Sequence, residues 1–274
     1  MTGNHKCLKP QERVIVALDV RSNDEALELV DELAGLITFY KVGLELLMGA
    51  GMNELLRRLV IDNRVFVDLK LPGDIPETIT RTVQSAAELG VTFVTLSHMS
   101  MASTIRVAVA ARGQKTSPEL LFVSFLSSLD RADFAELQGR QPSDFEAHLE
   151  QRSASMKQAG ADGFIVSGQE IGLFRTRYPD AVLVSPGIRP SGSPLDDHKR
   201  SCTPAEAIRL GADYIVVGRP IKNAGNRRDA AQRIVDEVAQ AADDGSARVA
   251  GRPSSGRSEH AHAETVMPAL PVSQ

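Results

Sequence analysis

Eight short apolar segments recur along the chain, each followed by a longer segment of mixed polarity. The segments are 14–18, 39–43, 65–70, 93–97, 120–126, 163–167, 182–186 and 213–218. They are rich in β-branched and aromatic residues and almost continuously apolar, which is typical of strands that are buried on both faces. The pattern therefore predicts eight parallel strands.

The segments between these strands have the spacing of amphipathic helices. Apolar residues recur at helical intervals in 23–36 and 76–90, and the second segment ends at Gly90, a suitable C-terminal cap. Eight strand–helix units predict a (β/α)8 TIM barrel, an α/β fold with a closed parallel eight-stranded barrel. A doubly wound open sheet is the alternative. The longest interval, 130–161, contains helix signals and a Pro-Ser break, and predicts extra helix after the fifth strand.

One barrel accounts for most of the chain. Its 274 residues, 42% of them hydrophobic, suffice for a fold that needs about 250 residues. We assign residues 1–12 to an N-terminal extension and 13–242 to the barrel, whose last helix is expected at about 226–241. Residues 243–274 are rich in Ser, Gly, Ala and charge without periodicity, and predict a disordered tail.

The composition restricts which partners the protein can bind and in which cellular compartment we expect it. The net charge of −4, with acids and bases mixed throughout, argues against nucleic acid as a partner. No segment approaches the roughly 18 apolar residues of a membrane span, and the N-terminus lacks the apolar stretch of an export signal. The only cysteines, Cys7 and Cys202, are far apart, which suggests neither a disulfide framework nor a zinc site. We expect a cytoplasmic protein.

Charged residues stand at the ends of the first three predicted strands. Asp19 ends the first strand, Lys41 lies in the second, Asp68 and Lys70 end the third, and Asp74 follows shortly after. Such barrels build their sites at these strand ends, although each residue alone is equally consistent with a solvated strand end or a salt bridge. Asp68 and Lys70 share one face of their strand, because side chains alternate. Together the residues predict an alternating array of ionised carboxylates and protonated lysines.

A second signal lies on the other side of the predicted barrel. Segment 185–192 contains two glycines and follows the seventh strand, and segment 216–221 contains Gly218-Arg219 and follows the eighth, where barrels commonly bind phosphate. Backbone N–H groups at glycines can approach phosphate, and Arg219 adds a forked cationic donor. A plain turn with a surface arginine is the alternative. The position favours a small phosphorylated substrate.

In this order, the motifs resemble those of the orotidine 5′-phosphate decarboxylase family, over about residues 13–230. The motifs are VALDV (16–20), KVGLEL (41–46), DLK with DIPET (68–78), FLSSL (125–129), SPGIRP (185–190), DDHKR (196–200) and GADYIVVGRPI (211–221). The resemblance implies decarboxylation of orotidine 5′-phosphate to uridine 5′-phosphate (UMP), the last step of de novo UMP synthesis. It implies no metal or organic cofactor, and a homodimer with shared active sites.

The resemblance also implies roles for individual residues. Lys70 would protonate C6 of the pyrimidine, with Asp68 and Asp74 arranging the charges around it. The implied substrate-binding residues are Asp19 and Lys41 at the ribose, Ser127 at the pyrimidine with Ser128 as a nearby alternative, and Pro186, His198, Gly218 and Arg219, with phosphate bound by Gly218 and Arg219. Asp74, Ile75 and Thr78 would be contributed by the partner subunit.

Two features depart from the family pattern. Leu71, Pro72 and Gly73 separate Lys70 from Asp74, where the family usually has two residues. Because glycine adopts backbone angles closed to other residues, we expect a local bulge near Gly73 to absorb the extra residue. The second departure is His198, which stands where the family usually has glutamine in the loop that closes on phosphate.

Two other functions are compatible with these motifs. The first is an Mg²⁺-dependent sugar-phosphate decarboxylase or aldolase of the same barrel superfamily, which shares the Asp-x-Lys strand. The second is a non-catalytic barrel that only binds a nucleotide. The DIPET segment (74–78) favours the decarboxylase over the first alternative.

Overall fold

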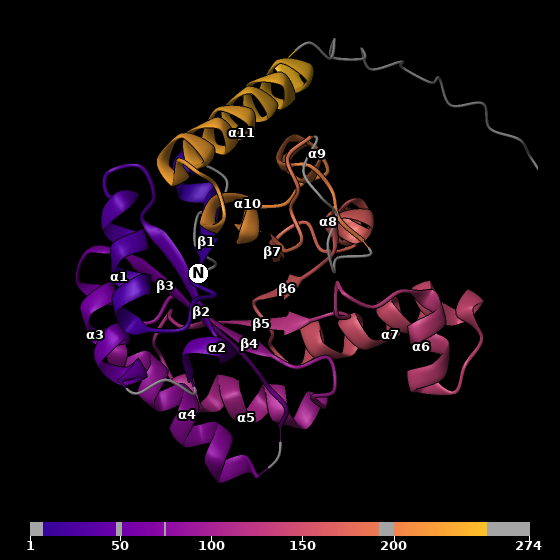
Figure 1. Cartoon of the computed structure of the whole chain (residues 1–274). Helices are drawn as coiled ribbons and strands as arrows, with labels where there is room; N and C mark the ends of the chain where they lie inside the picture. Colours follow the sequence, from indigo (N-terminus) through magenta and orange to yellow (C-terminus); the bar gives the residue numbers. More distant parts are fainter. Residues whose placement is uncertain (1–7, 48–50, 74, 192–199, 251–274) are drawn as a thin grey trace, which may run out of the picture.

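Eight parallel strands close into a barrel in which β8 pairs with β1. Figure 1 shows the strands with helices around them. The computed structural model describes residues 8–47, 51–73, 75–191 and 200–250, with side chains described as far as residue 244. The strands are β1 (Val14–Ala17), β2 (Phe39–Gly43), β3 (Arg64–Leu71), β4 (Phe93–Leu96), β5 (Glu119–Val123), β6 (Gly163–Ile165), β7 (Val182–Ser185) and β8 (Tyr214–Val217). The predicted closed barrel is confirmed, and the open-sheet alternative is wrong.

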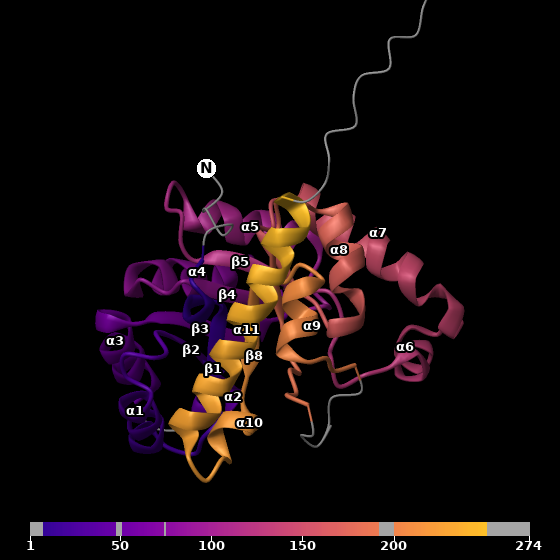
Figure 2. The same cartoon turned by 90° about the horizontal axis from the view of Figure 1, so that it is seen from above.

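Helices surround the barrel, and the last one packs against α9 (Figure 2). They are α1 (Asn23–Glu32), α2 (Leu44–Leu47), α3 (Met52–Asp62), α4 (Pro76–Leu89), α5 (Ala102–Arg112), α6 (Arg131–Gln138), α7 (Phe145–Gln158), α8 (Ile171–Arg177), α9 (Pro204–Arg209), α10 (Arg219–Lys222) and α11 (Arg227–Ala250). Their ends follow local chemistry: Ser22 caps the start of α1, Pro76 begins α4, and Gly90 ends α4 in the left-handed conformation.

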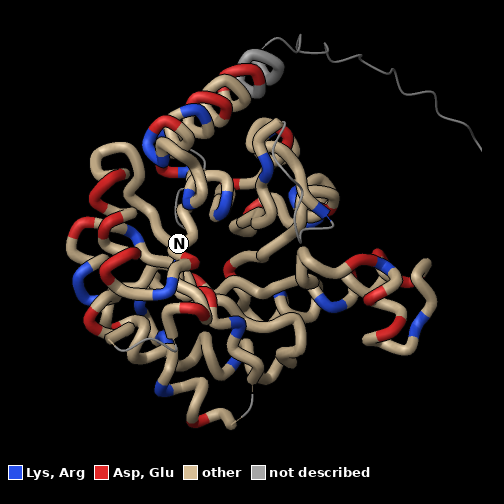
Figure 3. The backbone as a smooth tube through the Cα atoms, in the orientation of Figure 1, with Lys and Arg blue, Asp and Glu red and all other residues tan. Residues whose placement is uncertain are grey.

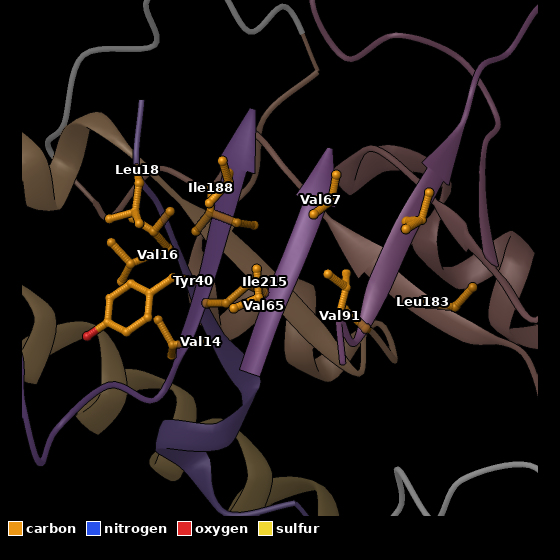
Figure 4. Packing of buried hydrophobic residues seen from close by; sticks show 14 of the residues in the cluster. Val14, Val16, Leu18, Tyr40, Val65, Val67, Val91, Leu183, Ile188 and Ile215 are labelled. Atoms are coloured by element: carbon orange, nitrogen blue, oxygen red, sulfur yellow. The ribbon is translucent and has the colours of Figure 1, made fainter. Parts of the chain in front are cut away.

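Alternate residues of each strand face two separate apolar cores. In β1, Val14 and Val16 pack outward against the helices, whereas Ile15 and Ala17 point into the barrel. Figure 4 shows the outer core, in which residues of several strands pack together. The strands are therefore buried on both faces, which explains why their sequences are almost continuously apolar.

Aromatic rings and an arginine close the amino-terminal end of the barrel. The guanidinium carbon of Arg64 lies 4.2 Å from the ring centroid of Phe39, and its Nη2 donates to the hydroxyl of Tyr214 at 2.9 Å. Outside them, Arg13 donates to the carbonyls of Ala212 and Asp213. The interior is thus filled at this end, and space for a ligand remains at the carboxyl ends of the strands.

The ends of the chain differ from the expected boundaries. Leu8 packs against the inner core, so part of the predicted extension belongs to the barrel. Helix α11 ends at Ala250, beyond the expected end near residue 241, so the predicted disordered tail begins inside this helix. Residues 251–274 lie outside the described part of the chain. Between β5 and β6, the predicted extra helix is present as α6, a short 3-10 helix (Pro142–Asp144) and α7.

Candidate active site

A pocket of about 510 Å³ opens at the carboxyl ends of the strands. Eight of the predicted site residues line it: Asp19, Lys41, Asp68, Lys70, Ser127, Pro186, Gly218 and Arg219. They come from β2, β3 and the segments that follow β1, β5, β7 and β8. Asp19 and Arg219, which are 200 positions apart in the sequence, therefore meet in one cavity, since all eight strands end on the same side.

Four charged side chains form a continuous alternating network on one wall of the pocket. Lys41 Nζ lies 2.9 Å from Asp19 Oδ1 and 3.7 Å from Asp68 Oδ2. Lys70 Nζ donates to both oxygens of the Asp68 carboxylate at 3.0 Å. The order is Asp19, Lys41, Asp68, Lys70, so the predicted alternation of acid and base is confirmed.

Threonine and glycine residues of neighbouring strands hold this network in place. Thr95 of β4 donates to Asp68 Oδ1 at 2.9 Å and accepts from the backbone N–H of Lys70 at 2.9 Å. A Cβ atom at Gly43 would lie only 3.0 Å from Lys41 Nζ, so the absence of a side chain there leaves room for the ammonium group. The positions of Asp68 and Lys41 are thus set by the barrel wall.

Charge pairing and hydrogen bonds together outweigh burial in setting the pKa values of Asp68 and Lys41. Burial alone would raise the pKa of Asp68, but the charges of Lys41 and Lys70, with hydrogen bonds from Lys70 and Thr95, hold it below its ordinary value. Burial would likewise lower the pKa of Lys41, yet Asp68 and Asp19 raise it. Asp68 therefore stays an anion and Lys41 a cation around neutral pH.

The backbone at Lys70 leaves the regular strand conformation. Lys70 has a φ of 48°, and the pairing of β3 with β4 shifts between Val67 and Leu71. Four residues of β3 thus span the length of two residues of β4. A lysine at positive φ is uncommon, and such strain is concentrated at functional sites. The irregularity turns Lys70 so that its ammonium reaches the carboxylate of Asp68.

The link after β3 is fixed by the segment around the start of α5. Ser100 Oγ donates to the carbonyls of Leu71 and Pro72 at 2.9 and 3.2 Å. Gly73 has a φ of 88°, and an added Cβ would overlap the side chain of Thr104. Gly73 thus takes the special backbone angle that the sequence predicted. The bulge itself lies earlier than expected, at Val67–Leu71.

Two cationic residues of the pocket were missed by the sequence reasoning. Arg189, from the SPGIRP motif, lines the pocket and is only 6% exposed. Lys222 is one helical turn after Arg219, also lines the pocket, and donates to the backbone carbonyl of Asp19. With Arg219, they make the wall formed by the β7 and β8 connections strongly cationic. The sequence did contain a signal for Arg189, because this arginine lies inside the SPGIRP motif that was selected for its glycine.

Comparisons with known proteins identify the family of this barrel. The family model described as "Orotidine 5'-phosphate decarboxylase / HUMPS family" matches residues 12–234. The chain belongs to this family. Orotidine 5'-phosphate decarboxylase from Nitrobacter winogradskyi is 41% identical over 247 residues, covering 88% of this chain and 98% of the relative. That from Methylobacterium nodulans is 43% identical over 238 residues, covering 85% and 98%.

A solved structure of the same name has the same fold. The crystal structure of orotidine 5'-phosphate decarboxylase from Lactobacillus acidophilus matches with a TM-score of 0.70 and 30% identity, covering 83% of this chain and 99% of that one. The orotidine 5′-phosphate decarboxylase family therefore accounts for nearly the whole described barrel.

Two of the residues predicted from the family resemblance, Ile75 and Thr78, are exposed and do not line the pocket. Asp74 and His198 lie outside the described residues. The link between Lys70 and Asp74 is therefore described as far as Gly73.

The rest of the surface has mixed charge. Figure 3 shows acidic and basic positions interspersed along the helices, α3 and α11 among them. Among the described residues, no three His, Cys, Asp or Glu side chains are grouped as metal ligands would be. Within the same residues, no helix is long and apolar enough to cross a membrane.

Proposed function

We propose that this barrel decarboxylates orotidine 5′-phosphate to UMP, a carboxy-lyase reaction of pyrimidine biosynthesis, with Lys70 as the proton donor. The observation that carries the proposal is the network of Asp19, Lys41, Asp68 and Lys70 in a pocket that Arg219 also lines. This arrangement supports the proposal because the charges that would react and the cation that would bind phosphate share one cavity.

The chemistry follows from where the charges lie. As CO2 leaves, the electron pair of the broken C–C bond stays on C6, an sp2 carbon without an adjacent electron sink. The ammonium of Lys70 stabilises this negative charge and then gives its proton to C6, which leaves a neutral amine. Asp68 faces the substrate carboxylate, and the repulsion between the two groups falls as the substrate loses its charge. By the family resemblance, Asp74 of the partner subunit supplies the second carboxylate.

The remaining pocket residues bind and orient the substrate. Arg219 and the backbone N–H of Gly218 hold the phosphate, with His198 as a further donor, and Arg189 adds a buried cation on that wall. Binding energy from the phosphate, remote from C6, supports orientation of the reacting centre.

The ribose and the pyrimidine lie against four further residues. Asp19 and Lys41 hold the ribose hydroxyls, and Ser127 hydrogen-bonds the pyrimidine, with Pro186 completing the wall. The charges of the chain itself supply the chemistry in this mechanism, so no cofactor takes part.

We also propose that the protein acts as a homodimer with shared sites. Large apolar side chains are exposed on the three neighbouring connections after β2, β3 and β4: Leu44, Leu47, Ile75, Met99 and Met101. Exposed apolar groups gathered in this way indicate an interaction surface. A two-fold contact there would bring Asp74, Ile75 and Thr78 of each subunit toward the site of the other. A cytoplasmic location stays a prediction from the cysteine content.

One assay tests the proposed reaction. EDTA-treated protein is incubated with orotidine 5′-phosphate, and UMP and CO2 are measured with and without added Mg²⁺. We expect equal amounts of both products, formed at the same rate in either condition. Turnover only with Mg²⁺ would instead favour the sugar-phosphate enzyme, and tight UMP binding without turnover would favour a nucleotide-binding barrel.

A further inference from the structure

An arginine and a glutamate are buried together behind the pocket, although neither side chain lines it. Arg200 is 4% exposed and Glu170, in the connection after β6, is 8% exposed. Arg200 Nη1 lies 2.8 Å from Glu170 Oε1. Burial raises the pKa of Glu170, and the charge of Arg200 opposes that shift. Such a pair is costly to bury, so its presence calls for a physical reason.

The remaining nitrogens of Arg200 hold a turn that forms part of the pocket. In this turn, residues 126–129, the backbone N–H of Leu129 donates to the carbonyl of Leu126 at 3.1 Å. Its two central residues, Ser127 and Ser128, line the pocket. We call residues 126–129 the serine turn. Arg200 Nη2 donates to the Leu126 carbonyl at 2.8 Å, and Arg200 Nε donates to the Leu129 carbonyl at 2.9 Å.

Aromatic rings restrict the guanidinium further. Its central carbon lies 5.5 Å from the ring centroid of Phe125 and 5.3 Å from that of Phe145. Phe125 directly precedes the serine turn and itself lines the pocket. Both ends of the turn and the residue before it therefore contact one side chain.

Only a planar guanidinium can satisfy this environment. Its three nitrogens reach three acceptors in different directions: the carboxylate of Glu170 and the carbonyls of Leu126 and Leu129. An ammonium group is a compact point charge and cannot span the two carbonyls and the carboxylate in this fork geometry. Glu170 fixes the guanidinium from the β6 side, and the guanidinium fixes the serine turn.

We propose that Arg200 and Glu170 are a positioning pair that holds the serine turn where its hydroxyls meet the pyrimidine ring. The pair thereby sets the preference of the pocket for a pyrimidine nucleotide over a sugar phosphate that lacks the base. This inference deepens the proposed function and rests on its assignment of the serine turn to the base. It predicts a base-specific loss of binding when the pair is altered.

The test compares two ligands in two variants. Affinities for UMP and for ribose 5-phosphate are measured by calorimetry in the full-length protein and in Arg200→Lys and Glu170→Gln. Both variants are expected to weaken UMP binding, Arg200→Lys by at least about tenfold, whereas ribose 5-phosphate binding changes less than about twofold. KM for orotidine 5′-phosphate should rise in parallel with the loss of UMP affinity.

A matched control comes from the same region of the fold. Arg131 of α6 and Glu146 of α7 form another Arg–Glu pair, but both side chains are about half exposed and neither lines the pocket. Arg131→Lys should leave both affinities unchanged. In a Ser127→Ala, Ser128→Ala background, Arg200→Lys should have a much smaller effect on UMP binding, since the hydroxyls that it positions are gone.

Two results would overturn the inference. One is an equal loss of affinity for UMP and for ribose 5-phosphate, which indicates a general loss of structure. The other is an unchanged UMP affinity in a folded variant. Glu170→Gln keeps the shape of the side chain, so it serves if Arg200→Lys does not fold. Failure of the proposed function is separately visible, because wild-type protein would then form no UMP from orotidine 5′-phosphate in the decarboxylation assay, whatever the two variants bind.

Discussion

At the scale of single residues, Asp68 organises the candidate site. Its carboxylate pairs with Lys70 and Lys41 and accepts from Thr95, so three groups from three strands converge on one side chain. Because these contacts lower the pKa of Asp68, the carboxylate keeps its charge around neutral pH. The network can thus keep a cation and an anion next to the reacting carbon without rearrangement.

Arg219 is the residue whose removal should separate binding from chemistry. Arg219→Ala removes a charged donor that follows β8, whereas the Asp68 and Lys70 charges lie on β3, so we expect KM to rise roughly ten- to a hundredfold with a smaller change in kcat. Steady-state kinetics with orotidine 5′-phosphate checks this. Arg58→Ala, at an exposed position of α3, is the control. An unchanged KM in Arg219→Ala would place the phosphate elsewhere.

Some site residues could be predicted from the sequence and others could not. Asp68 and Lys70 were found because charged residues recur at the ends of three neighbouring predicted strands, where a barrel builds its site. Arg189 and Lys222 lie beyond strand ends, where periodicity says nothing about burial. The positive φ of Lys70 was also not predictable, because the hydrogen bond from its N–H to Thr95 comes from another strand.

At the scale of elements, the end of β3 and the link that follows it are held by several contacts as far as Gly73. The shift in pairing at Val67–Leu71, the hydrogen bonds from Ser100 and the close contact of Gly73 with Thr104 all act on this short stretch. The extra residue in the link is therefore held by specific contacts, and the link should tolerate little change.

Two glycine substitutions separate backbone strain from crowding. Gly73 and Gly90 have similar positive φ values of 88° and 80°, but only Gly73 has a neighbour within 4 Å of an added Cβ. Gly90→Ala should cost about 1 kcal/mol of stability without loss of activity, since only strain is added. Gly73→Ala should cost more and also lower kcat. Urea unfolding and steady-state assays measure the two effects, and equal behaviour of both variants would argue against a tightly held link.

At the scale of the whole molecule, the barrel explains why the sequence predicts the fold so well. Each strand is buried on both faces, so all eight gave a strong apolar signal, and the closed topology followed from their number. The end of α11 was harder to place, because its last turns carry alanine and charge instead of an apolar stripe. Surface apolar residues after β2 to β4 carry no periodic signal, and only the fold shows that they lie on neighbouring connections.

The proposed dimer makes a prediction about mixed subunits. If Asp74 serves the neighbouring site, a dimer of one Lys70→Ala and one Asp74→Asn subunit has one intact site and one doubly altered site. Unfolding and refolding the two inactive variants together should recover about a quarter of the wild-type activity, since half of the dimers are mixed. Each variant refolded alone is the control. No recovery would mean that Lys70 and Asp74 act within one chain, or that neither is shared.

The most direct test of the account is the effect of Lys70→Ala on decarboxylation and on binding together. Release of CO2 from orotidine 5′-phosphate and the affinity for UMP are measured in the variant, in wild type and in Lys115→Ala, an exposed lysine beyond α5. The account predicts that Lys70→Ala lowers kcat by at least about 10³-fold while UMP binding stays measurable, and that Lys115→Ala behaves as wild type. A near-wild-type rate in Lys70→Ala would contradict it.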